Sequence, residues 1–240
     1  MTSEPTTSGS TTSGPATRGP EIDALIFDFD GLLIDSETPL FEIWQEIYRE
    51  HGCELHLDDW QHALGTFGGF DPYADIATRT GTTLERATLQ PIIRARHIAR
   101  CTPLPLLPGV AELLADAHAA GLKTAVASSS AIDWVGPFLD QHGLTARLHA
   151  ICTRDDVTRV KPAPDLFLLA AERMHVAPAR CVVFEDSPNG LRAARAAGMW
   201  AVAVPNPLTR TLPLPDPHLV LDSLALSRLA DIVAALARGW

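Results

Sequence analysis

Short apolar segments alternate with helical patterns over most of the chain. The apolar segments lie at residues 24–27, 124–127, 149–152, 181–184 and 200–204. Helical patterns lie between them, at 108–120, 134–142, 164–175 and 188–197. This alternation is typical of βαβ units, so residues 21–35 and 104–240 predict an α/β fold with a doubly wound parallel sheet. Ligands of such sheets bind outside the carboxyl ends of the strands.

Two parts of the chain lack the alternation. The first twenty residues include sixteen Ser, Thr, Pro or Gly, which cannot bury enough apolar surface to order a chain. Residues 1–20 therefore predict a disordered tail. Residues 36–103 show apolar positions at helical spacing and predict an all-helical insert. Its helices are expected at 38–52, 72–79 and 84–100, the last with Pro91 as a kink or break.

The first apolar segment ends in two acids, Asp28 and Asp30, with one phenylalanine between them. An unpaired carboxylate is costly to desolvate, so acids after a buried strand indicate a site that compensates their charge, most simply with a divalent cation. Acids also follow strands because loops are exposed to water. This motif alone leaves both interpretations open.

Three later segments also end in polar groups. Serines occupy positions 128–130, where hydroxyls either cap the next helix or bind phosphate through it. Lys161 stands before a proline that favours an extended backbone, either as a surface charge or as an inward phosphate clamp. Glu185 and Asp186 follow another apolar run, and a helix N-terminus explains only one of two acids there. Together these groups predict a site for Mg²⁺ and an anionic phosphoryl group.

Composition limits the partners. The chain has 240 residues, 46% hydrophobic and 20% charged, with a net charge of −10. Nucleic acid and anionic membranes need basic surface, so neither is expected as a partner. The four cysteines are scattered, as free thiols in a reducing cytosol would be, and we expect a cytoplasmic protein. A monomer is the default expectation.

The ordered set of motifs resembles the haloacid dehalogenase-like (HAD) superfamily. The residues that carry the resemblance are Asp28-Phe29-Asp30-Gly31, Ser128, Lys161-Pro162 and Glu185-Asp186. The helical insert resembles the cap of the phosphatase/β-phosphoglucomutase branch, and the resemblance covers roughly residues 21 to 225. It implies a Rossmann-like core (residues 21–35 and 104–240) with an inserted helical cap (residues 36–103).

The resemblance also implies a function. It indicates a Mg²⁺-dependent phosphatase that hydrolyses a small phosphorylated metabolite, such as a sugar phosphate, through an aspartyl-phosphate. Asp28 would be the nucleophile, and Asp30 would be the general acid and then the base that activates water. Ser128, Ser129 and Lys161 would hold the phosphoryl oxygens.

The metal ligands implied by the resemblance come from the first and last motifs. Asp28 and Asp186 would supply carboxylates, and Asp30 would supply its backbone carbonyl. Glu185 would either share the metal or stand behind its ligands.

The residues of the insert that face the substrate do not follow from the resemblance. Residues 65–71 are glycine-rich, which suits either a substrate-facing loop or an ordinary turn. His51 and His56 are candidate proton carriers, although a single histidine is more often at the surface or in packing. Arg79 and Arg94 are candidates to contact a distal phosphate, and nothing in the sequence selects between them.

Three rival functions remain at this point. A phosphosugar mutase shares all four motifs and differs in its product, an isomerised sugar phosphate. A dehalogenase is disfavoured by Asp30, because that chemistry needs no acid there. A non-enzymatic phospho-acceptor has a similar pocket, but the long insert and the nucleophile on the first strand argue against it.

Overall fold

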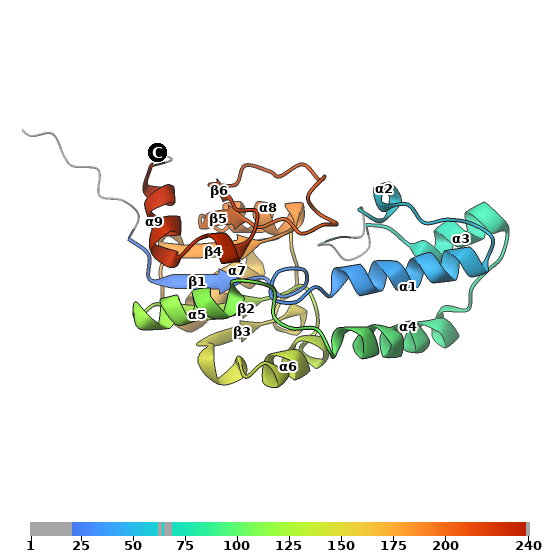
Figure 1. Cartoon of the computed structure of the whole chain (residues 1–240), viewed down its shortest axis with the longest axis horizontal. Coiled ribbons are helices and arrows are strands. Elements are labelled where there is room, and N and C mark those ends of the chain that lie inside the picture. The colour runs from blue at the N-terminus through green and yellow to red at the C-terminus, as the bar shows by residue number, and fades with distance from the viewer. Residues whose placement is uncertain (1–20, 62–63, 65–68, 239–240) are drawn as a thin grey trace, which may run out of the picture.

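The computed structural model describes residues 21–61, 64 and 69–238 (Figure 1). The expected disordered tail, residues 1–20, lies outside the described residues. The strands are β1 (Ala24–Phe27), β2 (Lys123–Ala127), β3 (Ala150–Cys152), β4 (Cys181–Glu185), β5 (Trp200–Ala203) and β6 (Leu219–Val220). The helices are α1 (Glu37–Glu50), α2 (Leu57–Trp60), α3 (Pro72–Thr80), α4 (Arg86–Cys101), α5 (Val110–Ala119), α6 (Ile132–Gln141), α7 (Asp165–Met174), α8 (Pro188–Ala196) and α9 (Leu229–Arg238). Short 3₁₀ turns lie at Thr145–Arg147, Arg154–Asp156, Pro178–Arg180 and Leu224–Leu226.

The six strands form a parallel sheet in the order β3-β2-β1-β4-β5-β6. The chain starts at the centre with β1, builds outward through β2 and β3, and then returns to the other side of β1 with β4. Phe27 at the end of β1 lies opposite Val126 of β2 and Phe184 of β4. The carboxyl ends of these three strands are therefore level, and the order reverses at β1, where α/β sheets bind ligands. The predicted fold class is confirmed.

Alternate residues of β1 pack into two different cores. Leu25 and Phe27 face a layer that contains α5, α6 and α9, whereas Ala24 and Ile26 face α7 and α8. All four side chains are fully buried. A strand covered by helices on both faces has no polar face, which is why the sequence shows a continuous apolar run at this point.

Helices α1 to α4, which belong to the predicted helical insert (residues 36–103), lie beside the sheet, with α1 and α4 next to each other (Figure 1). The insert has its own apolar cluster, which includes Trp44 and Tyr48 of α1 and Ile93 of α4. The Tyr48 hydroxyl donates to Asp75 of α3 at 2.7 Å and so joins two of its helices. Pro91 lies inside α4 without ending it.

The C-terminal part of the chain differs most from expectation. The short edge strand β6 and the bounds of α9 were not predicted from the sequence, although Leu229, Ile232 and Leu236 have helical spacing and are buried. The proline-rich segment 205–217 has no regular secondary structure, yet part of it is buried. Its Leu208 packs against the cluster of the insert. Among the described helices, none has both the length and the apolar character needed to cross a membrane.

Candidate active site

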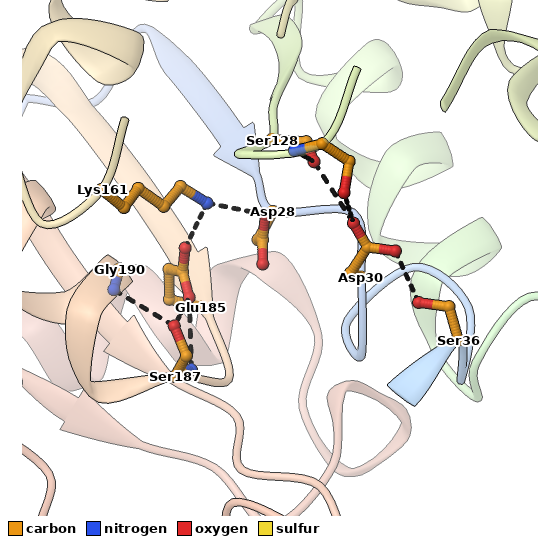
Figure 2. A network of polar contacts seen from close by, with 9 residues as sticks. Asp28, Asp30, Ser36, Ser128, Lys161, Glu185, Ser187 and Gly190 are labelled. Carbon is orange, nitrogen blue, oxygen red and sulfur yellow. Dashed lines mark hydrogen bonds and ion pairs between the residues drawn. The ribbon is translucent and has the colours of Figure 1, made fainter. Parts of the chain in front are cut away.

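Asp28 and Asp30 lie where β1 ends, and their carboxylates have different partners (Figure 2). The Asp28 amide still donates to Phe184 of β4, at 3.0 Å, so the sheet ladder fixes its backbone. Beyond it, Gly31 has a φ of +77°, a left-handed conformation that favours glycine. The chain therefore turns away from the strand directly after Asp30.

Lys161 lies between two acids of the core. Its Nζ is 2.6 Å from Asp28 Oδ1 and 2.5 Å from Glu185 Oε1, and all three side chains are buried. Nζ also lies 4.9 Å from the centre of the Phe167 ring. Burial alone lowers the pKa of Lys161, but the attraction of the two carboxylates outweighs it and holds the pKa above its usual value. Lys161 is therefore an ammonium group, as the clamp interpretation requires.

Glu185 has hydrogen-bond partners on both carboxylate oxygens. Oε1 accepts from Lys161, and Oε2 accepts from the Ser187 amide at 3.2 Å and the Ser187 hydroxyl at 3.0 Å. The hydroxyl in turn accepts from the Gly190 amide and caps α8. A Cβ at Gly190 would lie 1.8 Å from the Glu185 carboxyl carbon, so only glycine leaves room for this arrangement. Glu185 thus orients Lys161.

Asp28, Glu185 and Asp186 form an acid cluster in which each offers an oxygen within 4.8 Å of the others. Burial, followed by repulsion from Glu185, raises the pKa of Asp28 to about 7. The same causes raise the pKa of Asp186 well above its ordinary value. Lys161 balances one of three acidic groups, and carboxylate oxygens are the donors that Mg²⁺ prefers. The cluster therefore fits a hard divalent cation.

Asn206, in the proline-rich segment, holds Asp186. Its Nδ2 donates to Asp186 Oδ2 at 2.7 Å and lies 3.3 Å from the carbonyl oxygen of Gly31. A Cβ at Gly31 would lie 2.5 Å from this nitrogen and 2.7 Å from Asp186 Oδ2. Asn206 was not a candidate from the sequence, because it lies in an irregular segment and no motif marks its contact with Asp186, twenty positions earlier.

Asp30 accepts hydrogen bonds on both oxygens. Oδ1 accepts from the Ser36 hydroxyl at 2.6 Å and from the Trp134 indole at 2.8 Å. Oδ2 accepts from the Ser130 hydroxyl at 2.6 Å, with the Ser128 hydroxyl further away at 3.4 Å. The donors come from the start of the insert, from α6 and from the loop after β2. Only the serine run was identified in the sequence.

A cavity of about 290 Å³ lies beside Asp30, between the α/β core and the insert. Ser129, a predicted phosphate-binding residue, lines this cavity. Its hydroxyl oxygen is buried and has no hydrogen-bond partner among the described residues. A buried hydroxyl without a partner is costly, so this group is available to a bound ligand.

Glu37 also lines the cavity and was missed. It is half-buried at the start of α1. Burial, followed by repulsion from Asp30 and Asp28, raises its pKa to about 8. Nothing in the local sequence around Glu37 predicts that it lies near Asp30. The tertiary structure places both residues at the same cavity.

Among the candidate residues of the insert for substrate contact, Arg94 lies at the cavity, whereas Arg79 has partners within the insert. Arg94 lines the cavity and pairs with Asp133 of α6 at 2.9 Å. Arg79 instead pairs with two acids of the insert, both at 2.8 Å. His51 bonds to a carbonyl of its own helix, and His56 is exposed. Most of the glycine-rich loop lies outside the described residues, at 65–68.

Comparison with known proteins identifies the family. The model of the haloacid dehalogenase-like hydrolases matches residues 22–198, and the chain therefore belongs to this family, in its phosphatase branch. It is 45% identical to YhcW of Bacillus subtilis (strain 168) over 209 residues, which cover 87% of this chain and 95% of the relative. Fructose-1-phosphate phosphatase YqaB of Escherichia coli (strain K12) is 36% identical over 184 residues, 75% of this chain and 95% of the relative.

A solved structure of CbbY from Rhodobacter sphaeroides, in complex with xylulose-(1,5)-bisphosphate, superposes with a TM-score of 0.71. It is 29% identical and covers 88% of this chain and 98% of CbbY. The family and the fold predicted from the four motifs are thus confirmed. The roles of the individual site residues stay predictions.

Proposed function

We propose that this chain is a Mg²⁺-dependent phosphatase of small phosphorylated metabolites, sugar phosphates foremost, that works through an aspartyl-phosphate on Asp28. One observation carries the proposal: Asp28 has charged partners, whereas Asp30, two positions later, has neutral hydrogen-bond donors as partners. Asp28 lies against Lys161 and the acid cluster, whereas Asp30 lies among hydrogen-bond donors beside the cavity. The name of YqaB, a fructose-1-phosphate phosphatase, and the sugar bisphosphate bound by CbbY support this substrate class.

In the first step a carboxylate oxygen of Asp28 attacks phosphorus, and the bond between phosphorus and the ester oxygen breaks. Asp30, in its protonated form, gives its proton to the departing oxygen, so the product leaves as an alcohol. Lys161 stabilises the negative charge on the phosphoryl oxygens and on Asp28. The Ser128 and Ser129 hydroxyls donate to the same phosphoryl group.

In the second step a water molecule attacks the phosphorus of the aspartyl-phosphate. Asp30, now a carboxylate, accepts the proton of this water. The bond between phosphorus and the Asp28 oxygen breaks, which releases inorganic phosphate and regenerates both aspartates. One residue acts first as acid and then as base, so the cycle returns every proton.

The residues that would hold Mg²⁺ are Asp28 and Asp186, with the backbone carbonyl of Asp30 as a further donor. When bound, the metal ion would neutralise part of the charge that the acid cluster and the substrate bring together. Asn206 holds Asp186 in place for this purpose.

The helical insert, residues 36–103, would act as the cap that closes over the substrate and excludes bulk water. The cavity beside Asp30 takes residues from both units, including Arg94 and Glu37 from the insert. A cation and a carboxyl group on one wall suit a polyhydroxylated substrate with an anionic end.

The test is phosphate release from a panel of phosphorylated metabolites, with and without Mg²⁺, and with Asp28→Asn as the control. We expect release that depends on Mg²⁺ and is lost in the variant. Trapping of ³²P on the wild-type chain, and not on Asp28→Asn, would identify the intermediate.

The products separate the rival functions. An isomerised sugar phosphate without inorganic phosphate would identify a mutase instead. A stable phosphorylated chain without turnover would identify a phospho-acceptor. Undiminished release by Asp28→Asn would overturn the assignment of the nucleophile.

A further inference from the structure

His97 of α4 contacts two residues that hold Asp30. Its ring stacks on the indole of Trp134 in α6, with centroids 4.4 Å apart and planes 23° apart. Its Nε2 lies 2.7 Å from the Ser36 carbonyl oxygen. Trp134 and Ser36 are the two groups that donate to Asp30 Oδ1. One side chain of the insert thus supports both donors of one oxygen.

The protonation of His97 follows from its contacts. A carbonyl oxygen only accepts hydrogen bonds, so Nε2 must carry a proton and donate to Ser36. Burial lowers the pKa of His97, which favours the neutral ring with its single proton on Nε2. A neutral ring stacks on the indole without the cost of burying a charge.

The contact of His97 with Trp134 is also a contact between the insert and the core. Trp134 belongs to the core helix α6, whereas His97 belongs to the insert. One turn earlier on α4, Arg94 pairs with Asp133, the neighbour of Trp134. The face of α4 that carries these two residues therefore meets α6, and separation of the two units would break both contacts.

We infer that His97 is a positioning residue through which the insert sets the orientation of the Asp30 carboxylate. The inference rests on the proposed function, in which Asp30 transfers the proton. With the insert against the core, His97 holds the Trp134 indole and the Ser36 backbone, and these hold Oδ1. When the insert moves away, His97 leaves the Trp134 indole and Ser36 moves away from Asp30 with the insert, so Asp30 is aligned for proton transfer only over a closed site.

The choice of leaving group tests this inference. An alkyl phosphate needs a proton from Asp30 when its alcohol leaves, whereas p-nitrophenyl phosphate releases a stable anion and needs little help. The alkyl substrate is the best one from the panel above. The variants are His97→Ala, His97→Gln, which keeps a donor for Ser36, and Trp134→Phe, which keeps the stack. Ile98→Ala, at an exposed neighbour of His97, is the matched control.

We expect His97→Ala to lower kcat/KM about tenfold with the alkyl phosphate and less than about twofold with p-nitrophenyl phosphate. His97→Gln should recover part of the loss, and Ile98→Ala should match the wild type. The double variant His97→Ala with Trp134→Phe should lose no more than the worse single variant, because both act on the same oxygen.

Equal losses with the two substrates, or additive losses in the double variant, would overturn the inference. Circular dichroism and the urea midpoint show whether each variant is folded, and His97→Gln carries the test if His97→Ala does not fold. A wild-type chain that releases phosphate from neither substrate would instead overturn the proposed function. The two failures are therefore distinguishable.

Discussion

The two sides of the site are held in different ways. Around Asp28, the partners are the charged groups Lys161, Glu185 and Asp186, all from the carboxyl edge of the sheet and all buried. Around Asp30, the partners are neutral donors, and one of them, Ser36, stands at the start of the insert. The Asp28 side is thus fixed by the core, whereas the Asp30 side depends on how two units meet.

The difference follows from the chemistry that each side is proposed to perform. A nucleophile and a metal must keep their geometry in every turnover, and buried opposite charges attract strongly in a low dielectric. A group that gives and then takes a proton must change its charge. Neutral hydroxyl and indole donors allow such a change at lower cost than a fixed ion pair.

The largest effects should come from the two aspartates themselves. Asp28→Asn removes the nucleophile and should lower kcat by about 10⁴-fold or more with alkyl and aryl phosphates alike. Asp30→Asn should cost about 10²- to 10⁴-fold with an alkyl phosphate and clearly less with p-nitrophenyl phosphate. Steady-state kinetics with both substrates measures this, and urea unfolding controls for the fold. Equal sensitivity of the two variants to the leaving group would contradict the division of roles.

The next largest effect should be on stability, at Lys161. Lys161→Met leaves two buried carboxylates without their cation and should lower the free energy of unfolding by about 3–5 kcal/mol in EDTA, measured by urea denaturation. Adding Glu185→Gln should recover part of the loss. Arg159→Met removes an exposed ion pair with Asp165 and should change little. A stable Lys161→Met chain would show that the Asp28 side does not depend on charge balance.

A smaller effect is expected at Asn206, which connects the proline-rich segment to Asp186. Asn206→Ala should raise the Mg²⁺ concentration for half-maximal activity about 10- to 100-fold, because an unsupported ligand binds a metal less well. Asn189→Ala, at a side chain that contacts Arg192 on α8, is the matched control. An unchanged Mg²⁺ requirement would contradict a role of Asn206 in holding a metal ligand.

The smallest effect concerns pH. The pKa of Asp28 is raised from 3.8 to about 7, so the metal-free folded chain binds a proton that the unfolded chain releases. Its contribution to stability is full below about pH 4 and is lost as the pH rises through about 7. In EDTA, Tm should therefore fall over this window. Mg²⁺ should raise Tm more at the upper end, where the acids are ionised.

Differential scanning fluorimetry with EDTA or Mg²⁺ measures this dependence. In Asp28→Asn, Tm in EDTA should depend less on pH, because the titration of Asp28 no longer contributes. A Tm in EDTA that rises from the lower to the upper end of the window would contradict the sign derived from Asp28 and Asp186.

The Asp28 side was largely predictable from the sequence. Neighbouring parallel strands end at one edge, so residues that follow β1 and β4 must meet there whatever the details of packing. Local order along the chain, an apolar run and then acids, was enough to find Asp28, Glu185 and Asp186. Lys161 followed because it precedes a helix at the same edge.

The Asp30 side was not predictable in the same way. In the sequence, Trp134 has the helical spacing of an ordinary core residue of α6. His97 is one of many residues in the helical pattern of α4, and nothing distinguishes it from the others. Nothing local marks either as a neighbour of Asp30. The hydrogen bond from Trp134 joins residues 104 positions apart, and only the packing of α6 beside the end of β1 brings them together.

The amino-acid sequence by itself determined the alternation of strands and helices, the helical character of the insert and the four polar motifs, because these depend on local periodicity and on the cost of burying charge. The tertiary structure decided what surrounds each motif: the donors of Asp30, the support of Asp186 by Asn206 and the contact of His97 with Trp134. Those contacts join segments that are far apart in the sequence, and the identity of a side chain does not show which distant segment it will contact.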